Sequence, residues 1–191
     1  MPSVYDTAAI GRDGDKSAMY YFAYGSNMCT ARLARRVPSV RPLGPAWLDG
    51  HQLHWHLIGN DGSAKCNVRA TQDLADRVHG VLFELDAERL DDLHAAEGPA
   101  YHFLELETGR AQGPVTAAIY RGRSEWLDDS LTPFGWYRDF VVAGAVEHGL
   151  PTDWIDGLAA VPVATDPDPE RIAANREILQ ETPDNVILER R

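Results

Sequence analysis

The strand pattern of this chain limits its fold more than any other feature. Strand-like segments are expected at 20–24, 52–58, 78–85, 101–107 and 115–121, and a single short helix, at 87–97, is expected among them. Sequential strands with few crossover helices favour an antiparallel or mixed sheet over a doubly wound α/β fold. We therefore predict an α+β fold in which helices surround a small mixed, largely antiparallel β-barrel.

Helical patterns flank this strand series. One runs from Thr30 to Val37, where Pro38 ends it. The longest, at 134–148, places its apolar and small residues on one stripe. A second helix is expected to begin near Thr152, and 170–179 carries a short amphipathic pattern.

The length of 191 residues fits one domain with short additions. Residues 1–18 are polar, bear glycines and show no hydrophobic period, so we predict a flexible N-terminal leader. Residues 19–163 are expected to form the domain. The charged stretch 164–191 is predicted to be a C-terminal appendage.

The charge balance argues against nucleic acid and membrane surfaces as partners. Lys and Arg number 18 against 29 Asp and Glu, which gives a formal net charge of −11. The arginines at 32, 35, 36 and 41 could form a local basic patch, and we interpret them as a solvated helix face. Without an apolar span or a secretion signal, the chain is predicted to be soluble and cytoplasmic.

Metal, thiol and cofactor chemistry receive little support from the sequence. His51, His54 and His56 cluster without a close third ligand type, so no metal is predicted. Cys29 would lie near a helix N-terminus, where the pKa of a thiol falls, but no partner for a thiol nucleophile can be identified. Neither the serine-hydrolase nor the dinucleotide-binding glycine motif occurs, and no cofactor is predicted.

A glycine turn after the first strand is the first candidate site. The run at 20–24 leads into Gly25, Ser26 and Asn27, and a helical pattern follows. Such a joint can gather backbone N–H groups around a cavity that suits a carboxylate or a developing oxyanion. The same residues also fit a plain connection in which Gly25 supplies an unusual φ angle and Ser26 or Asn27 caps the helix.

Glu97 is the second candidate. Leu90, Leu93 and Glu97 share one face of the short helix, so the carboxylate is expected to point inward with the leucines. Gly98 ends the helix just after it, which places the carboxylate at the negative end of the helix dipole. Burial and dipole would both raise its pKa, as a general base near neutral pH requires. The alternative is a last-turn glutamate that turns out into water.

These segments together resemble the γ-glutamylcyclotransferases and their AIG2-like relatives. The resemblance rests on 21–28 (YFAYGSNM), on 78–83 followed by 93–98 (LHAAEG), and on Tyr137 with the stretch 143–151, all in family order. It covers roughly residues 20–161. One departure is His94, which stands where the family often has aspartate.

The resemblance implies an enzyme that cyclises a γ-glutamyl amino acid or amine and releases 5-oxoproline. It implies Glu97 as general base and then acid, substrate binding by Gly25, Ser26 and Asn27, and a pocket lined by Tyr24 and Tyr137. A small-molecule substrate is the expected partner, and a homodimer is left open. Two alternatives remain: removal of a γ-glutamyl protecting group in a biosynthetic pathway, and a non-catalytic module that binds a small anion.

Overall fold

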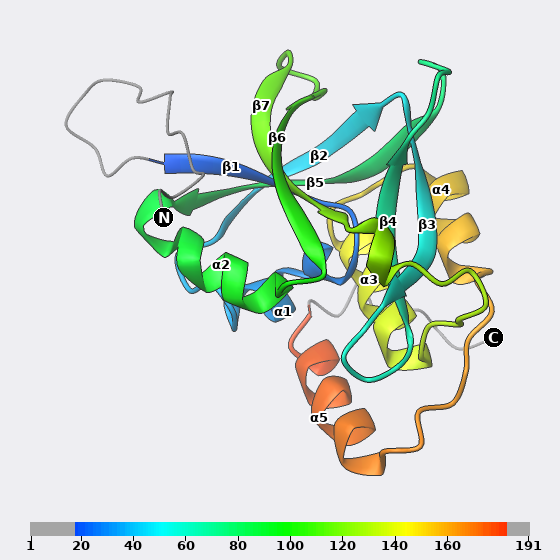
Figure 1. The fold of residues 1–191 in the computed structure, drawn as a ribbon. Coiled ribbons are helices and arrows are strands. Elements are labelled where there is room, and N and C mark those ends of the chain that lie inside the picture. Colours follow the sequence, from blue (N-terminus) through cyan, green and yellow to red (C-terminus); the bar gives the residue numbers. More distant parts are fainter. Residues whose placement is uncertain (1–17, 183–191) are drawn as a thin grey trace, which may run out of the picture.

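The computed structural model describes residues 18–182 (Figure 1). The strands are β1 (Ala18–Ala23), β2 (Arg41–Asp49), β3 (His51–Ile58), β4 (Ala64–Ala70), β5 (Arg77–Asp86), β6 (Tyr101–Thr108) and β7 (Val115–Gly122). The α-helices are α1 (Thr30–Ala34), α2 (Leu90–Glu97), α3 (Gly135–Glu147), α4 (Thr152–Ala159) and α5 (Pro169–Gln180). Short 3₁₀ helices η1 (Ser26–Met28), η2 (Ala87–Arg89) and η3 (Ser124–Trp126) complete the order.

Five strands form a mixed sheet in the order β2-β5-β1-β7-β6, and β3 and β4 form a separate two-stranded sheet. β1 runs parallel to β7, and the other neighbours pair antiparallel. The five-stranded sheet is not closed, but Trp47 on one edge strand and Gly109 beyond the other exchange backbone hydrogen bonds of 2.9 and 2.8 Å. The predicted fold class is therefore confirmed, with a barrel that is only partly closed.

Two strands were not predicted from the sequence. β2 contains Pro42 and Pro45, which disfavour a strand, but it lies at the sheet edge and its register shifts between Pro42 and Gly44. Edges and bulges are where sheets tolerate proline. β4 follows a short turn after β3 and pairs with β3 as a hairpin, so the structure contains a second sheet that was not predicted.

Helix α3 is largely buried and fixes the segment that follows β1. Its predicted apolar stripe is confirmed, with Tyr137, Phe140 and Val141 buried. Gly144 allows a close approach, because a Cβ atom built there would lie 2.4 Å from the backbone nitrogen of Cys29 and from the carbonyl carbon of Met28. The backbone after the glycine turn therefore rests directly on α3.

The predicted C-terminal appendage lies against the rest of the fold as far as residue 182. Asp166 accepts hydrogen bonds from Trp136 Nε1 (2.7 Å) and Arg171 Nε (2.6 Å). Helix α5 also meets α1, where Arg32 donates to Asn175 Oδ1 at 3.1 Å. The predicted leader lies outside the described residues except for Ala18, and the division into leader, domain and appendage stays a prediction.

Within residues 18–182, the helices are too short or too polar to cross a membrane.

Candidate active site

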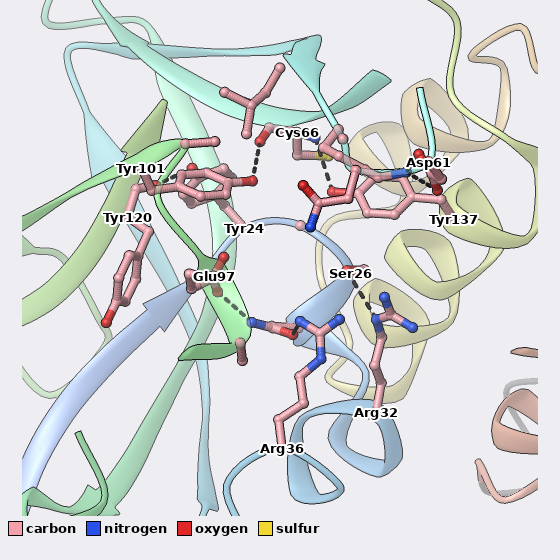
Figure 2. Close-up of a pocket in the computed structure, with 18 of the residues that line it drawn as sticks. Tyr24, Ser26, Arg32, Arg36, Asp61, Cys66, Glu97, Tyr101, Tyr120 and Tyr137 are labelled. Carbon is pink, nitrogen blue, oxygen red and sulfur yellow. Dashed lines mark hydrogen bonds and ion pairs between the residues drawn. The ribbon is translucent and has the colours of Figure 1, made fainter. Parts of the chain in front are cut away.

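All six residues singled out from the sequence line one cavity of about 240 Å³: Tyr24, Gly25, Ser26, Asn27, Glu97 and Tyr137. Its volume lies just below the roughly 300–1,000 Å³ of drug-sized ligand sites, so it suits a small metabolite. In Figure 2, Glu97 and Tyr24 lie on one side of the cavity and Tyr137 and Asp61 on the other. Arg32 of α1 and Arg36, two residues beyond its end, approach from below. The structure thus brings the two candidate segments together in one pocket.

Gly25 is required for close packing and not for an unusual backbone angle. Its φ is −122°, which any residue adopts, so the alternative in which Gly25 supplies an unusual φ is wrong. A Cβ atom at this position would lie 3.1 Å from Cys66 Cβ and 3.2 Å from the Tyr137 hydroxyl. The absence of a side chain therefore lets the turn approach β4 and α3.

The Gly25→Ala variant is expected to lose both stability and catalytic efficiency, because Cys66 or Tyr137 must move to admit the methyl group. We expect about 1–2 kcal/mol less free energy of unfolding and a lower kcat/KM. Urea unfolding and steady-state kinetics measure both. Gly135→Ala is the control, since its Cβ would meet its nearest neighbour at an ordinary 3.9 Å. Equal losses in the two variants would contradict this explanation.

Glu97 ends α2 and points into the pocket, so the expected inward orientation is confirmed. Leu93 on the same face is fully buried, and Gly98, with a φ of +74°, ends the helix in a conformation that favours glycine. Glu97 Oε1 accepts hydrogen bonds from Asn27 Nδ2 at 2.6 Å and from the Tyr21 hydroxyl at 3.0 Å. The half-buried carboxylate is therefore tied to the segment that contains the glycine turn.

Burial raises the pKa of Glu97 above its usual value. Arg36 and Arg32, together with the hydrogen bonds from Tyr21 and Asn27, oppose this effect by stabilising the ionised form. The direction agrees with the expectation from the helix pattern. A carboxylate with a raised pKa can both take up and return a proton near neutral pH.

Tyrosine hydroxyls form much of the pocket wall. The Tyr24 hydroxyl donates to the carbonyl of Tyr120, and the Tyr137 hydroxyl accepts from the backbone N–H of Cys66 at 2.9 Å. Burial raises the pKa of Tyr21, Tyr24 and Tyr137 well above the usual range. These hydroxyls therefore stay protonated and neutral at physiological pH.

Two arginines of the predicted solvated face belong to the pocket instead. Arg32 and Arg36 line it, and burial lowers the pKa of Arg32 to about 10. Arg32 Nε donates to Ser26 Oγ at 3.2 Å, and its guanidinium lies over the Phe140 ring at 4.4 Å. The interpretation as solvated is thus wrong for these two side chains. A signal was available, since positions 32 and 36 are four residues apart and so share one face of a helix.

The hairpin between β3 and β4 adds an ion pair that sequence reasoning missed. Lys65 Nζ contacts Asp61 Oδ2 at 2.8 Å, and both side chains line the pocket with 15% and 11% of their surface exposed. Asp61 lies in the segment 60–63, whose residues are typical of a turn but do not indicate which side faces a cavity. The pocket therefore contains three cationic side chains and the carboxylates of Asp61 and Glu97.

The described part of the chain favours neither a reactive cysteine nor a metal site. Burial raises the pKa of Cys29 to about 11 and that of Cys66 to about 12, so the lowered thiol pKa considered for Cys29 is wrong. Among residues 18–182, no three His, Cys, Asp or Glu side chains are placed to hold a metal ion. His56 is instead buried and contacts Asp129 Oδ1 at 2.7 Å and Asn67 Nδ2 at 3.0 Å.

Comparisons with known proteins agree with the motif resemblance. Residues 77–158 match the AIG2-like family. The human protein named gamma-glutamylcyclotransferase is 29% identical over 154 residues, which cover 77% of this chain and 80% of that protein. The mouse protein of the same name is 27% identical over 158 residues, covering 79% and 81%.

Solved structures share the fold. A structure described as a gamma-glutamyl cyclotransferase has a TM-score of 0.75 at 22% identity and covers 84% of this chain and 99% of its own. The structure of an uncharacterized human protein has a TM-score of 0.74 at 23% identity, and the match covers 86% of this chain and 99% of that one. Residues 77–158 therefore resemble the AIG2-like family, most of the chain is similar in sequence to the gamma-glutamylcyclotransferases, and the solved structures share its fold.

Proposed function

We propose that the chain is an enzyme of the gamma-glutamylcyclotransferase type, which converts a γ-glutamyl amino acid or amine to 5-oxoproline and a free amine. The observation that carries this proposal is the pairing of Glu97 with the glycine turn. Both line one small cavity, and Asn27 of the turn donates directly to the Glu97 carboxylate at 2.6 Å. The names of the human and mouse relatives support the same reaction class.

The reaction is an intramolecular acyl transfer. The α-amine of the glutamyl group attacks its own γ-carbonyl carbon, a C–N bond closes the five-membered ring, and the bond to the departing nitrogen breaks. The nucleophile is part of the substrate, so the site has only to fold the substrate, move protons and stabilise the oxyanion. This chemistry needs neither a metal nor an organic cofactor.

Glu97 performs the proton transfers in this scheme. The α-ammonium group has three protons and the lactam nitrogen of the product has one, so two protons pass to the departing nitrogen, which leaves as an ammonium. Glu97 takes each proton from the α-nitrogen and returns it to the departing nitrogen. The carboxylate ends each cycle ionised, as it began.

The remaining pocket residues bind and orient the substrate. We assign backbone N–H groups of Gly25, Ser26 and Asn27 to a substrate carboxylate or to the oxyanion. Tyr24 and Tyr137 form the pocket wall. The cationic Arg32 and Arg36 give the pocket a charge that suits an anionic substrate.

A panel of γ-glutamyl amino acids and γ-glutamyl amines tests the proposed function. Release of 5-oxoproline, followed by chromatography, is expected from at least one class. Turnover of several γ-glutamyl amino acids would favour a general activity, whereas turnover of one decorated amine would favour removal of a protecting group. Tight binding of these compounds by calorimetry, without 5-oxoproline after long incubation, would contradict the enzyme assignment and leave a binding module.

A further inference from the structure

The two oxygens of the Glu97 carboxylate have different surroundings. Oε1 accepts both hydrogen bonds, from Asn27 Nδ2 and from the Tyr21 hydroxyl. Within residues 18–182, no donor contacts Oε2. Asn27 Nδ2 also lies 3.1 Å from the Tyr21 hydroxyl, so these three side chains form one connected group. The oxygen atoms are therefore not equivalent as proton acceptors.

The orientation of the Asn27 amide decides which atom faces Glu97. If the amide were rotated by half a turn, its Oδ1 would face the carboxylate and repel it. Arg36 prevents this, because its NH1 group donates to Asn27 Oδ1 at 2.9 Å. With Oδ1 held by a guanidinium, the NH₂ group must point toward Glu97.

Arg36 is itself held in place by the end of α1. Its backbone N–H donates to the carbonyl of Leu33 at 2.9 Å, and the next residue, Val37, is fully buried and bonds to the same carbonyl. The side chain therefore leaves a fixed stretch of backbone. No acidic side chain among residues 18–182 forms an ion pair with Arg36, so its charge is available to the pocket.

We propose that Arg36 is a positioning residue, which holds the Asn27 amide so that Asn27 and Tyr21 occupy Oε1 and leave Oε2 as the oxygen that exchanges protons with the substrate. This inference rests on the proposed function and assigns a role that neither the motif nor the comparisons give to this arginine. The positive charge of Arg36 also favours the ionised form of Glu97, which the carboxylate must regain in order to accept the next proton.

The charged and titratable groups that face Glu97 come from three elements and the residues just after them. Tyr21 and Tyr24 belong to β1 and the turn after it, Arg32 and Arg36 to α1 and its end, and Tyr101 to β6. The tyrosines are neutral, so Arg36 and Arg32 supply the positive charge. Arg32 bonds to Ser26 and Asn175 and not to Asn27, so orientation of the amide depends on Arg36.

The test compares Arg36→Met with Arg35→Met, a matched control. Arg35 is the adjacent residue, is half exposed and pairs with Glu181 outside the pocket. The titration of the Glu97 carboxyl is followed by ¹³C NMR in the free protein, with the signal assigned by its loss in Glu97→Gln. Arg36→Met is expected to raise the titration midpoint of Glu97, because it removes both the charge and the amide orientation. Arg35→Met is expected to leave the midpoint unchanged.

Kinetics provide the second measurement. The acid limb of the pH profile of kcat/KM should move upward in Arg36→Met together with the NMR midpoint. At neutral pH we expect kcat/KM to fall about 10- to 100-fold, the usual cost of losing a hydrogen bond to a charged group. Arg36→Lys retains a cationic donor, so both kcat/KM and the titration midpoint of Glu97 are expected to stay close to the wild-type values.

An unchanged Glu97 midpoint in Arg36→Met, or an equal shift in Arg35→Met, would overturn the proposal. If Arg36→Met does not fold, Arg36→Gln replaces it in the test, because glutamine is also neutral and similar in length. The titration midpoint of Glu97 must then rise in Arg36→Gln. The titration is measured without substrate, so it tests the role of Arg36 separately from the reaction. The titration midpoint can stay unchanged in Arg36→Met while Glu97→Gln still loses activity. Conversely, an absence of 5-oxoproline from every substrate of the panel would refute the proposed function without changing the titration result.

Discussion

The Glu97→Gln variant is expected to fold normally and to form 5-oxoproline about 10²–10⁴ times more slowly than the wild-type protein, the usual contribution of a positioned general base. The amide has almost the same shape as the carboxylate. Its oxygen can still accept the hydrogen bonds from Asn27 and Tyr21 that Glu97 Oε1 accepts now. The substitution therefore removes the proton-accepting capacity with little change in packing. Initial rates at saturating substrate measure the loss in kcat.

Glu105→Gln is the matched control for this substitution. Glu105 is exposed on β6 and does not line the pocket, so the same chemical change there should leave kcat near the wild-type value. Circular dichroism and thermal unfolding of both variants separate a folding defect from a catalytic one. Wild-type turnover in a folded Glu97→Gln protein would exclude Glu97 as the base. A similar loss in Glu105→Gln would show that the effect is not specific to the pocket.

The position of Glu97 could be predicted because a helix forces a regular spacing. Once Leu93 is assigned to the core, the carboxylate four residues later must share its direction. Gly98 adds a second constraint, since it ends the helix at this residue. The glycine turn was predictable for the same kind of reason, because a strand that stops at a short glycine segment must change direction there.

The surroundings of Glu97 could not be predicted from local patterns. The bond from Asn27 to Glu97 joins residues 70 positions apart, and Tyr21 reaches Glu97 across 76 positions. Such contacts follow from the antiparallel pairing of β1 with β5, which places the start of α2 beside β1. A local sequence pattern indicates which face of an element is apolar, but it does not indicate which distant side chain lies opposite.

The hairpin shows a second limit of pattern reasoning. In a regular strand, residues 56 and 57 would point to opposite faces, yet His56 and Leu57 are both buried. The cause is a register shift between Trp55 and Leu57, which breaks the strict alternation of the strand. Bulges of this kind depend on the partner strand, and β4 itself was not predicted. The wall of the pocket formed by Asp61 and Lys65 was missed with it.

Gly144→Ala is expected to be among the most destabilising single substitutions outside the pocket. Alanine has the higher helix propensity, by about 1 kcal/mol, but a Cβ atom here would lie 2.4 Å from backbone atoms of Met28 and Cys29. Backbone atoms held between β1, η1 and α1 cannot move aside as a flexible side chain can. We therefore expect the clash to outweigh the propensity and to lower the free energy of unfolding by roughly 2–3 kcal/mol.

Gly157→Ala distinguishes this clash from a general effect of alanine. Gly157 also lies inside a helix, α4, but it is exposed and a Cβ atom there meets nothing within 4 Å. That variant should gain roughly 0.5–1 kcal/mol, so urea unfolding should shift the two midpoints in opposite directions. The turn residues follow the backbone that Gly144 supports, so Gly144→Ala should also lower kcat/KM while Gly157→Ala does not. Equal stability of the two variants would mean that the turn can shift away from α3 without cost, and the rigid support of the pocket inferred from this contact would be wrong.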